Sequence, residues 1–156
     1  MKSSTRHAVL AAVLTFAVAG LGGVAPAQDR DRIVTERQEA MKQQGREMVS
    51  VRNYVQDKGD QAAAIAALDS LQKSVPKVAD WFPPGTGIGE VPIKTRAKPE
   101  IWQQHDKFLA ADKTVMAQIA ALDAAVKSGD KPKIEAVFKE VGFCSACHDT
   151  FRAKEQ

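Results

Sequence analysis

The two cysteines of the chain, Cys144 and Cys147, stand close together near its C-terminal end, and His148 directly follows the second one. Cys-x-x-Cys-His is the attachment signature of a c-type haem. The two thiols form thioether bonds to the vinyl groups of the porphyrin, and the histidine approaches the iron as its proximal ligand. The pattern therefore predicts one covalently bound haem c, attached through Cys144 and Cys147, with His148 as the iron ligand.

Three other kinds of site use the same residue types. A structural zinc site needs four ligands, and beyond this cluster the chain past residue 27 offers only His105. A thioredoxin-like redox pair normally accompanies a βαβ pattern, which is not visible in this sequence. A structural disulfide between these cysteines would close a very short loop and would stabilise little. These alternatives stay open, but the motif favours haem.

Residues 1–27 have the three parts of a secretory signal peptide. Two basic residues supply the positive start, residues 8–21 form an apolar run, and residues 25–27 read Ala-Pro-Ala, a small-residue cleavage site. The apolar run is too short for a comfortable transmembrane helix. We expect cleavage after Ala27, which would leave residues 28–156 as one haem-binding domain in the periplasm, with no stable membrane anchor. An uncleaved anchor is the alternative.

The charge pattern and the lack of catalytic motifs narrow the function. The whole chain has a net charge of +3, and loss of the signal peptide would lower it to about +1. Basic and acidic residues are interspersed, so we expect no nucleic acid as a partner. We find no paired carboxylates, nucleophile with its base, or phosphate-binding loop, so we do not expect an enzyme.

The spacing of apolar residues is helical from about residue 29 onward, with no convincing strand pattern, which predicts an all-α protein. The expected helices lie at about 31–56, from the Asp60 cap to about 80, from Pro99 to about 126, and from Asp130 to about 154. Short connections join the first helix to the second and the third to the fourth. This arrangement predicts an antiparallel up-down-up-down four-helix bundle, a fold that builds cofactor sites in its core.

Two of these helices carry further expectations. If residues 144–148 are helical, Cys144, Cys147 and His148 lie on one face of the helix and can all contact one flat ligand. The core residues of the third helix alternate steps of four and three, as packed helices require. They are Ile101, His105, Phe108, Asp112, Val115, Ile119, Leu122 and Val126. We therefore expect His105 to be a buried structural histidine.

The chain past the signal peptide resembles the class II c-type cytochromes, which comprise cytochrome c-prime and its low-spin relatives. The resemblance rests on three segments, "VGFCSACHDTFR", "KTRAKPEIW" and "TERQEAMKQQGREM". It implies the same four-helix bundle and the same roles for the two cysteines and His148. It also implies that Arg37, Gln38 and Met41 line the opposite face of the haem, where Arg37 can pair with the propionates.

The resemblance leaves the role of Met41 open. In the low-spin relatives a methionine at this position is the sixth iron ligand, and "MKQQGREM" looks more like those proteins. A thioether ligand favours reduced iron and suits one-electron transfer. We therefore expect an electron carrier with Met41 as the distal iron ligand. In the alternative, Met41 only fills space, and the protein is a five-coordinate, high-spin cytochrome c-prime that binds or buffers nitric oxide.

The expected partners follow from this resemblance. An electron carrier requires redox partner proteins, whose identity the sequence does not reveal. Cytochromes of this family are commonly dimers through their first two helices, so the resemblance also implies a homodimer.

Overall fold

The computed structural model describes residues 27–140 and 144–154, so nearly all of the expected signal peptide lies outside the described residues. The helices are α1 (Ala27–Val55), α2 (Gln61–Ser74), α3 (Glu100–Gln103), α4 (His105–Ser128), α5 (Lys131–Glu140) and α6 (Ser145–Phe151). Two short 3₁₀ helices, η1 (Val75–Lys77) and η2 (Ala79–Trp81), follow α2. In the described part of the chain, the β-type pairing is limited to an isolated antiparallel bridge between Ala97 and Arg152. The all-α prediction is confirmed.

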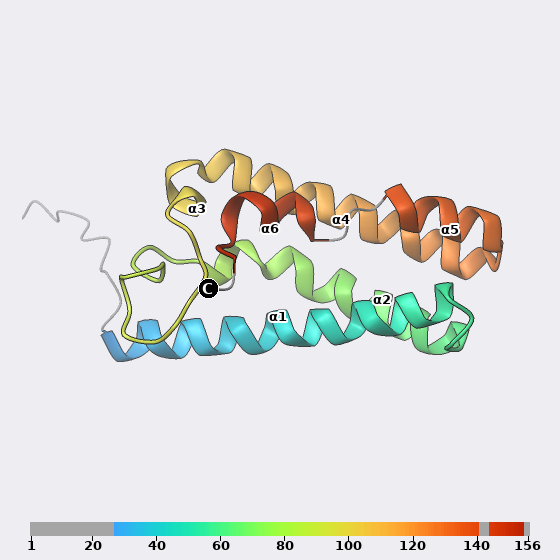
Figure 1. Cartoon of the computed structure of the whole chain (residues 1–156), viewed down its shortest axis with the longest axis horizontal. Helices are drawn as coiled ribbons and strands as arrows, with labels where there is room; N and C mark the ends of the chain where they lie inside the picture. Colours follow the sequence, from blue (N-terminus) through green and yellow to red (C-terminus); the bar gives the residue numbers. More distant parts are fainter. Residues whose placement is uncertain (1–26, 141–143, 155–156) are drawn as a thin grey trace, which may run out of the picture.

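The long helices run alternately up and down the molecule (Figure 1). Helix α2 returns along α1, α4 packs on α2, and α5 and α6 both return along α4. The fourth arm of the bundle is therefore made of α5 and α6 together, and the up-down-up-down prediction is confirmed. Among the described helices, none has the length and apolar character needed to cross a membrane.

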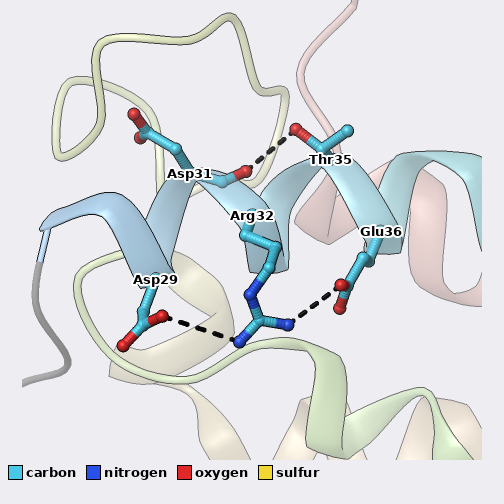
Figure 2. Close-up of polar contacts among 5 residues, drawn as sticks. All are labelled: Asp29, Asp31, Arg32, Thr35 and Glu36. Atoms are coloured by element: carbon cyan, nitrogen blue, oxygen red, sulfur yellow. Dashed lines mark hydrogen bonds and ion pairs between the residues drawn. The ribbon is translucent and has the colours of Figure 1, made fainter.

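Helix α1 begins with a set of local polar contacts on its exposed surface (Figure 2). Arg32 forms ion pairs with Asp29 at 3.7 Å and with Glu36 at 2.9 Å, one turn away on either side. The hydroxyl of Thr35 donates a hydrogen bond to the carbonyl oxygen of Asp31 at 2.9 Å. Exposed pairs of this kind contribute well under about 1 kcal/mol each, so α1 is held mainly by the apolar face that it buries.

Helix α2 starts where the sequence predicts. A side-chain oxygen of Asp60 accepts a hydrogen bond from the backbone N–H of Ala63 at 2.8 Å, which is the geometry of an N-cap. The α-helix gives way to η1 and η2, and regular structure then stops ahead of Pro83. The rigid proline ring and the missing N–H account for the end of the helical segment.

The buried apolar residues form two clusters. The first lies toward the α4–α5 end and includes Val51, Leu68, Leu122, Val126 and Ile134, all fully buried. The second consists of Val78, Ala97, Ile101, Phe108 and Phe151. In the second cluster, the ring of Phe108 makes edge-on contacts with the rings of Phe82 and Phe151, each at a centroid distance of 5.2 Å. The side chain of Cys147 packs against both clusters.

The third helix is not continuous, contrary to the sequence-based expectation. The backbone of Gln104 leaves the helical region, with φ −124° and ψ 46°, and separates α3 from α4. The break changes the direction in which side chains after Gln104 point relative to those of α3, while Ile101 before it and Phe108 after it are both buried. His105 consequently points outward and is exposed, so the prediction of a buried structural histidine is wrong.

The fourth helix is also interrupted. Cys144 has a φ of +64°, in the left-handed region that side chains other than glycine rarely adopt. A continuous helix through the cysteines is therefore wrong at Cys144, which precedes α6 instead of lying within it. Residues 141–143, which the expected helix would have crossed, lie outside the described residues.

Candidate cofactor site

A cavity of about 660 Å³ opens between the helices at the place where the two core clusters meet. This volume lies within the range of pockets that hold small molecules and cofactors. Its apolar walls come from α2 and the 3₁₀ segment that follows it, and from α3, α4 and α6: Leu71, Val75, Val78, Ile101, Phe108, Val115, Ile119 and Phe151. Met41 and Met48 add two thioether side chains from α1. A flat, largely apolar ligand fits such walls.

Cys144, Cys147 and His148 all line this cavity, as the sequence predicts. The carbonyl oxygen of Cys144 accepts hydrogen bonds from the backbone N–H groups of Cys147, at 3.2 Å, and His148, at 2.8 Å. Cys144 thus begins the short helix that carries the other two residues. The break at Cys144 therefore does not separate the three side chains from their common cavity.

Both cysteines are free thiols in this structure. Burial raises the pKa of Cys144, and burial with the nearby charge of Asp112 raises the pKa of Cys147 to about 11. Both side chains are therefore protonated at neutral pH. Thiolate is the form that attacks disulfides and binds metals, so this environment favours neither a redox pair nor direct metal binding through sulfur. Two neutral thiols in an apolar wall suit covalent attachment of a porphyrin.

His148 is held in the neutral form that can bind a metal. Burial lowers its pKa, and the positive charges of Arg152 and Arg96 lower the pKa further. The guanidinium of Arg152 lies close to the ring, with Nη1 3.2 Å from Nδ1. Metal binding requires an unprotonated imidazole nitrogen, and these surroundings favour that form of His148.

Arg37 is the largest departure from the expected site geometry. Its side chain is buried, and its terminal nitrogens donate hydrogen bonds to the connection that follows η2. The acceptors are Trp81 O at 3.2 Å, Thr86 Oγ1 at 3.1 Å, Thr86 O at 2.9 Å and Thr95 Oγ1 at 3.0 Å. Its guanidinium carbon also lies 4.3 Å from the centre of the Phe82 ring. Arg37 therefore ties this connection to α1.

The two other residues expected on this face, Gln38 and Met41, also line the cavity. The amide nitrogen of Gln38 donates a hydrogen bond to the carbonyl oxygen of Lys94 at 2.7 Å, so it holds the same connection from a second point. Met41 is half-buried and packs against the second core cluster. The three residues assigned to this face thus lie together at the cavity. Two of them, Arg37 and Gln38, form hydrogen bonds to the loop that borders it.

Trp81 and Phe82 both pack against the second core cluster. The indole N–H of Trp102 donates to the carbonyl oxygen of Phe82 at 2.9 Å and fixes the start of the connection. The aromatic pair therefore covers core residues.

Asp112 is a site residue that the motif search missed. It lies on α4 in the row of core positions, is only 6% exposed, and lines the cavity. The sequence carried a signal for it, because an acidic residue stood in the four-and-three pattern where apolar residues are expected. An acidic residue in that position indicates either a buried hydrogen-bonded carboxyl or a functional one.

These residues fit a c-type haem. The thiol pair and the neutral imidazole line one cavity, whose walls are mainly apolar. Burial lowers the pKa of Arg37 to about 10, so its guanidinium is still charged at neutral pH, and the described residues give it no carboxylate partner. A buried cation of this kind favours an anionic group on the ligand. Haem propionates have that charge.

A haem-attachment motif that lines the core cavity of an up-down-up-down bundle defines a class II c-type cytochrome. The family model described as cytochrome C' matches residues 32–152, and the chain belongs to this family. Its cofactor is accordingly haem c, bound covalently.

Curated relatives support the same assignment. A cytochrome c' from Rhodospirillum rubrum is 33% identical over 159 residues, an alignment that covers 98% of this chain and 99% of the relative. A cytochrome c' from Cereibacter sphaeroides is 40% identical over 96 residues, which cover 61% of this chain and 64% of that protein. The similarity therefore extends over the whole domain in one relative and is higher over a shorter segment in the other.

Solved structures share the fold. A cytochrome c' from Rhodobacter sphaeroides is 32% identical with a TM-score of 0.72, and the match covers 81% of this chain and 99% of that one. A nitric oxide complex of a cytochrome c prime variant from Alcaligenes xylosoxidans is 29% identical with a TM-score of 0.68, over 80% of this chain and 97% of that one. A cytochrome c' described as having ligand-controlled dimer dissociation is 23% identical and has a TM-score of 0.70, which indicates a common fold.

Proposed function

We propose that this chain is a periplasmic mono-haem cytochrome in which His148 would be the one protein ligand of the iron and the cavity beside Met41 would admit nitric oxide. The bound group supplies one-electron redox chemistry and a site for a small gas. The observation that carries the proposal is the shared cavity. The cavity is lined both by the attachment motif, at the start of α6, and by Met41 on α1. The family also includes a cytochrome c prime solved as a nitric oxide complex.

The chain's own residues would divide the work. Cys144 and Cys147 would hold the porphyrin through thioether bonds, and His148 would present a neutral nitrogen to the metal. The charge of Arg37 would attract a propionate, while its hydrogen bonds to Thr86 keep the bordering loop in place. Gln38 would support the same loop through Lys94.

The wall of α1 beside Met41 has room for a small ligand. Met41, Gly45 and Met48 succeed one another along this wall at steps of four and three residues, and all three line the cavity. A Cβ atom added at Gly45 would meet nothing within 4 Å outside its own helix. Gly45 is exposed, and the open space beside it supports access of a diatomic gas to the cavity next to Met41.

A second candidate is the low-spin electron carrier, with the sulfur of Met41 as the sixth ligand. The specific observation in its favour is that Met41 reaches the cavity from α1, whereas His148 reaches it from α6, and these two helices flank the bundle on different sides (Figure 1). In that case the thioether would fill the position that a gas would otherwise occupy.

Optical spectra of the purified holoprotein, in both oxidation states and with nitric oxide added, separate the two candidates. The proposal expects a high-spin iron at neutral pH and a spectral change on addition of nitric oxide to the reduced protein. A low-spin spectrum that nitric oxide leaves unchanged would overturn it in favour of the electron carrier.

Export and assembly are parts of the same proposal. We infer cleavage after Ala27, release of residues 28–156 into the periplasm, and association into a homodimer. N-terminal sequencing of the mature protein tests the cleavage site, and sedimentation equilibrium tests the dimer. A mature chain that keeps residues 1–27, or a monomer at all accessible concentrations, would contradict the corresponding part.

A further inference from the structure

Asp112 is a carboxyl group inside the bundle core. It lies on α4 one turn after Phe108 and one turn before Val115, both of which are buried. The residue as a whole is 6% exposed, and it forms part of the cavity wall. In a four-helix bundle such a position normally holds an apolar residue, so this carboxyl group needs a physical explanation.

The carboxyl group of Asp112 has no partner among the described residues, where neither a hydrogen bond nor an ion pair joins it to another side chain or to the backbone. Burial alone raises its pKa, and its charge in turn raises the pKa of Cys147 on α6. Asp112 thus lies near the thiol that attaches the porphyrin, and it can gain or lose a proton there.

The charged groups around Asp112 come from three elements. Arg37 and Lys42 line the cavity from α1, and Lys94 and Arg96 line it from the connection before α3. The titratable but neutral His148 lines it from α6, and Arg152 from the position directly after α6. The cavity-lining residues of α2 and η1 are Leu71 and Val75, which carry no charge. Arg37 is engaged by the carbonyl and hydroxyl groups of the loop, and Lys42 pairs with Glu39. Asp112 is the acidic residue among cavity-lining groups whose other charged members, Arg37, Lys42, Lys94, Arg96 and Arg152, are cationic.

We propose that Asp112 is a proton-binding site coupled to the redox state of the haem. This inference rests on the proposed function. When the iron accepts one electron, the carboxylate of Asp112 takes up one proton from solvent, and re-oxidation releases the same proton. The physical reason is electrostatic, because an electron added to the haem removes one positive charge from the cavity and so stabilises the protonated carboxyl.

The midpoint potential measured against pH tests the coupling. The potential of the wild-type holoprotein should fall as the pH rises, with a slope that approaches about 59 mV per pH unit where one proton accompanies one electron. Asp112→Asn keeps the shape of the side chain but cannot titrate, so its potential should be flat over the same range. Asp106→Asn, an exposed position on the same helix, should behave like the wild type. An Asp112→Asn variant that keeps the wild-type slope would overturn the proposal, because the slope would then belong to the propionates or to His148.

An infrared difference spectrum between the reduced and oxidised wild type gives a second, independent measurement. Reduction should produce the C=O stretch of a protonated carboxyl, which shifts in heavy water and which Asp112→Asn lacks. Absence of this band in the wild type contradicts the inference. A low-spin spectrum that nitric oxide leaves unchanged would instead refute the proposed function, so the two failures are distinguishable.

Discussion

Arg37 holds Thr86 through both of its terminal nitrogens, although 49 residues separate the two in sequence. Nη1 lies 3.1 Å from the hydroxyl oxygen, and Nη2 lies 2.9 Å from the carbonyl oxygen. Thr86 is itself fully buried and donates its hydroxyl hydrogen to the carbonyl of Pro83 at 2.8 Å. The long connection between η2 and α3 is therefore organised around a buried cation from α1, and its course along the cavity depends on that residue.

Replacement of Arg37 by Leu should lower stability markedly. The change removes the donor to two buried acceptors of Thr86 and to two part-buried acceptors, on Trp81 and Thr95. Each buried acceptor left without a donor costs about 1–3 kcal/mol. We expect a decrease of about 3 kcal/mol in the free energy of unfolding, measured by urea titration of the holoprotein. Arg46→Leu is the control, because the Arg46 side chain is exposed and bonds only to Gln43 in the described structure. Equal losses in the two variants would contradict this role for Arg37.

The double substitution of Cys144 and Cys147 by Ala should abolish covalent attachment of haem. Both thiols line the cavity, and the chain has no other cysteine. The bundle should also lose stability, because a group bound only to the folded state stabilises it. Extraction with acidified organic solvent, followed by mass spectrometry, measures the retained haem. Haem that survives this treatment in the double variant would refute the attachment sites.

Replacement of His148 by Ala should change the spin state and the potential of the iron while the thioether bonds still hold the porphyrin. The ring lies at the cavity next to Arg152, and its nitrogen is the ligand that the proposal requires. Electron paramagnetic resonance of the matured variant gives the measurement. The exposed His105 serves as a matched control, since His105→Ala should leave the spectrum unchanged.

Asp112→Asn should raise stability at neutral pH, and the gain should shrink in acid. Burial raises the folded-state pKa of Asp112 above its ordinary value, so the folded protein binds this proton more tightly than the unfolded chain does. The wild type is therefore penalised when the carboxyl is ionised, and the penalty disappears as the pH falls through the folded-state pKa. Urea titrations of the reduced holoprotein between neutral and mildly acidic pH provide the comparison. A constant difference between the two proteins across this range would show that Asp112 does not titrate with a raised pKa.

The helical framework was predictable because its causes are local and periodic. The core positions at Val34 and Val51 follow from apolar spacing, and both are fully buried. The start of α2 followed from the preference of aspartate for N-cap positions, which Asp60 satisfies. The attachment motif was predictable for a similar reason, since its three residues are neighbours in sequence.

The deviations arise from single backbone residues whose conformations the periodic pattern does not encode. Gln104 breaks the third helix and turns His105 outward, while the left-handed Cys144 breaks the fourth. Arg37 lines the cavity, but its hydrogen-bond partners depend on the path of a loop whose residues lie 49 and 58 positions away in sequence. Asp112 could have been selected from the sequence, because a carboxylate at a core position costs free energy unless something in the core offsets it.

Met41→Leu gives the sharpest test of the iron's sixth position. Leucine keeps the apolar volume nearly constant, so packing alone should cost less than about 1.5 kcal/mol. If Met41 only fills space, as we propose, the spectra and nitric oxide binding of the variant should stay close to those of the wild type. If its sulfur binds the iron, the variant should change from low-spin to high-spin, its potential should fall, and it should gain access to small gases. Met48→Leu is the matched control, because Met48 lines the same cavity from the same helix, two turns further on. This variant should leave the spectra unchanged in either case. A spin-state change in Met41→Leu that Met48→Leu does not share would therefore refute the open sixth position and establish Met41 as the distal ligand.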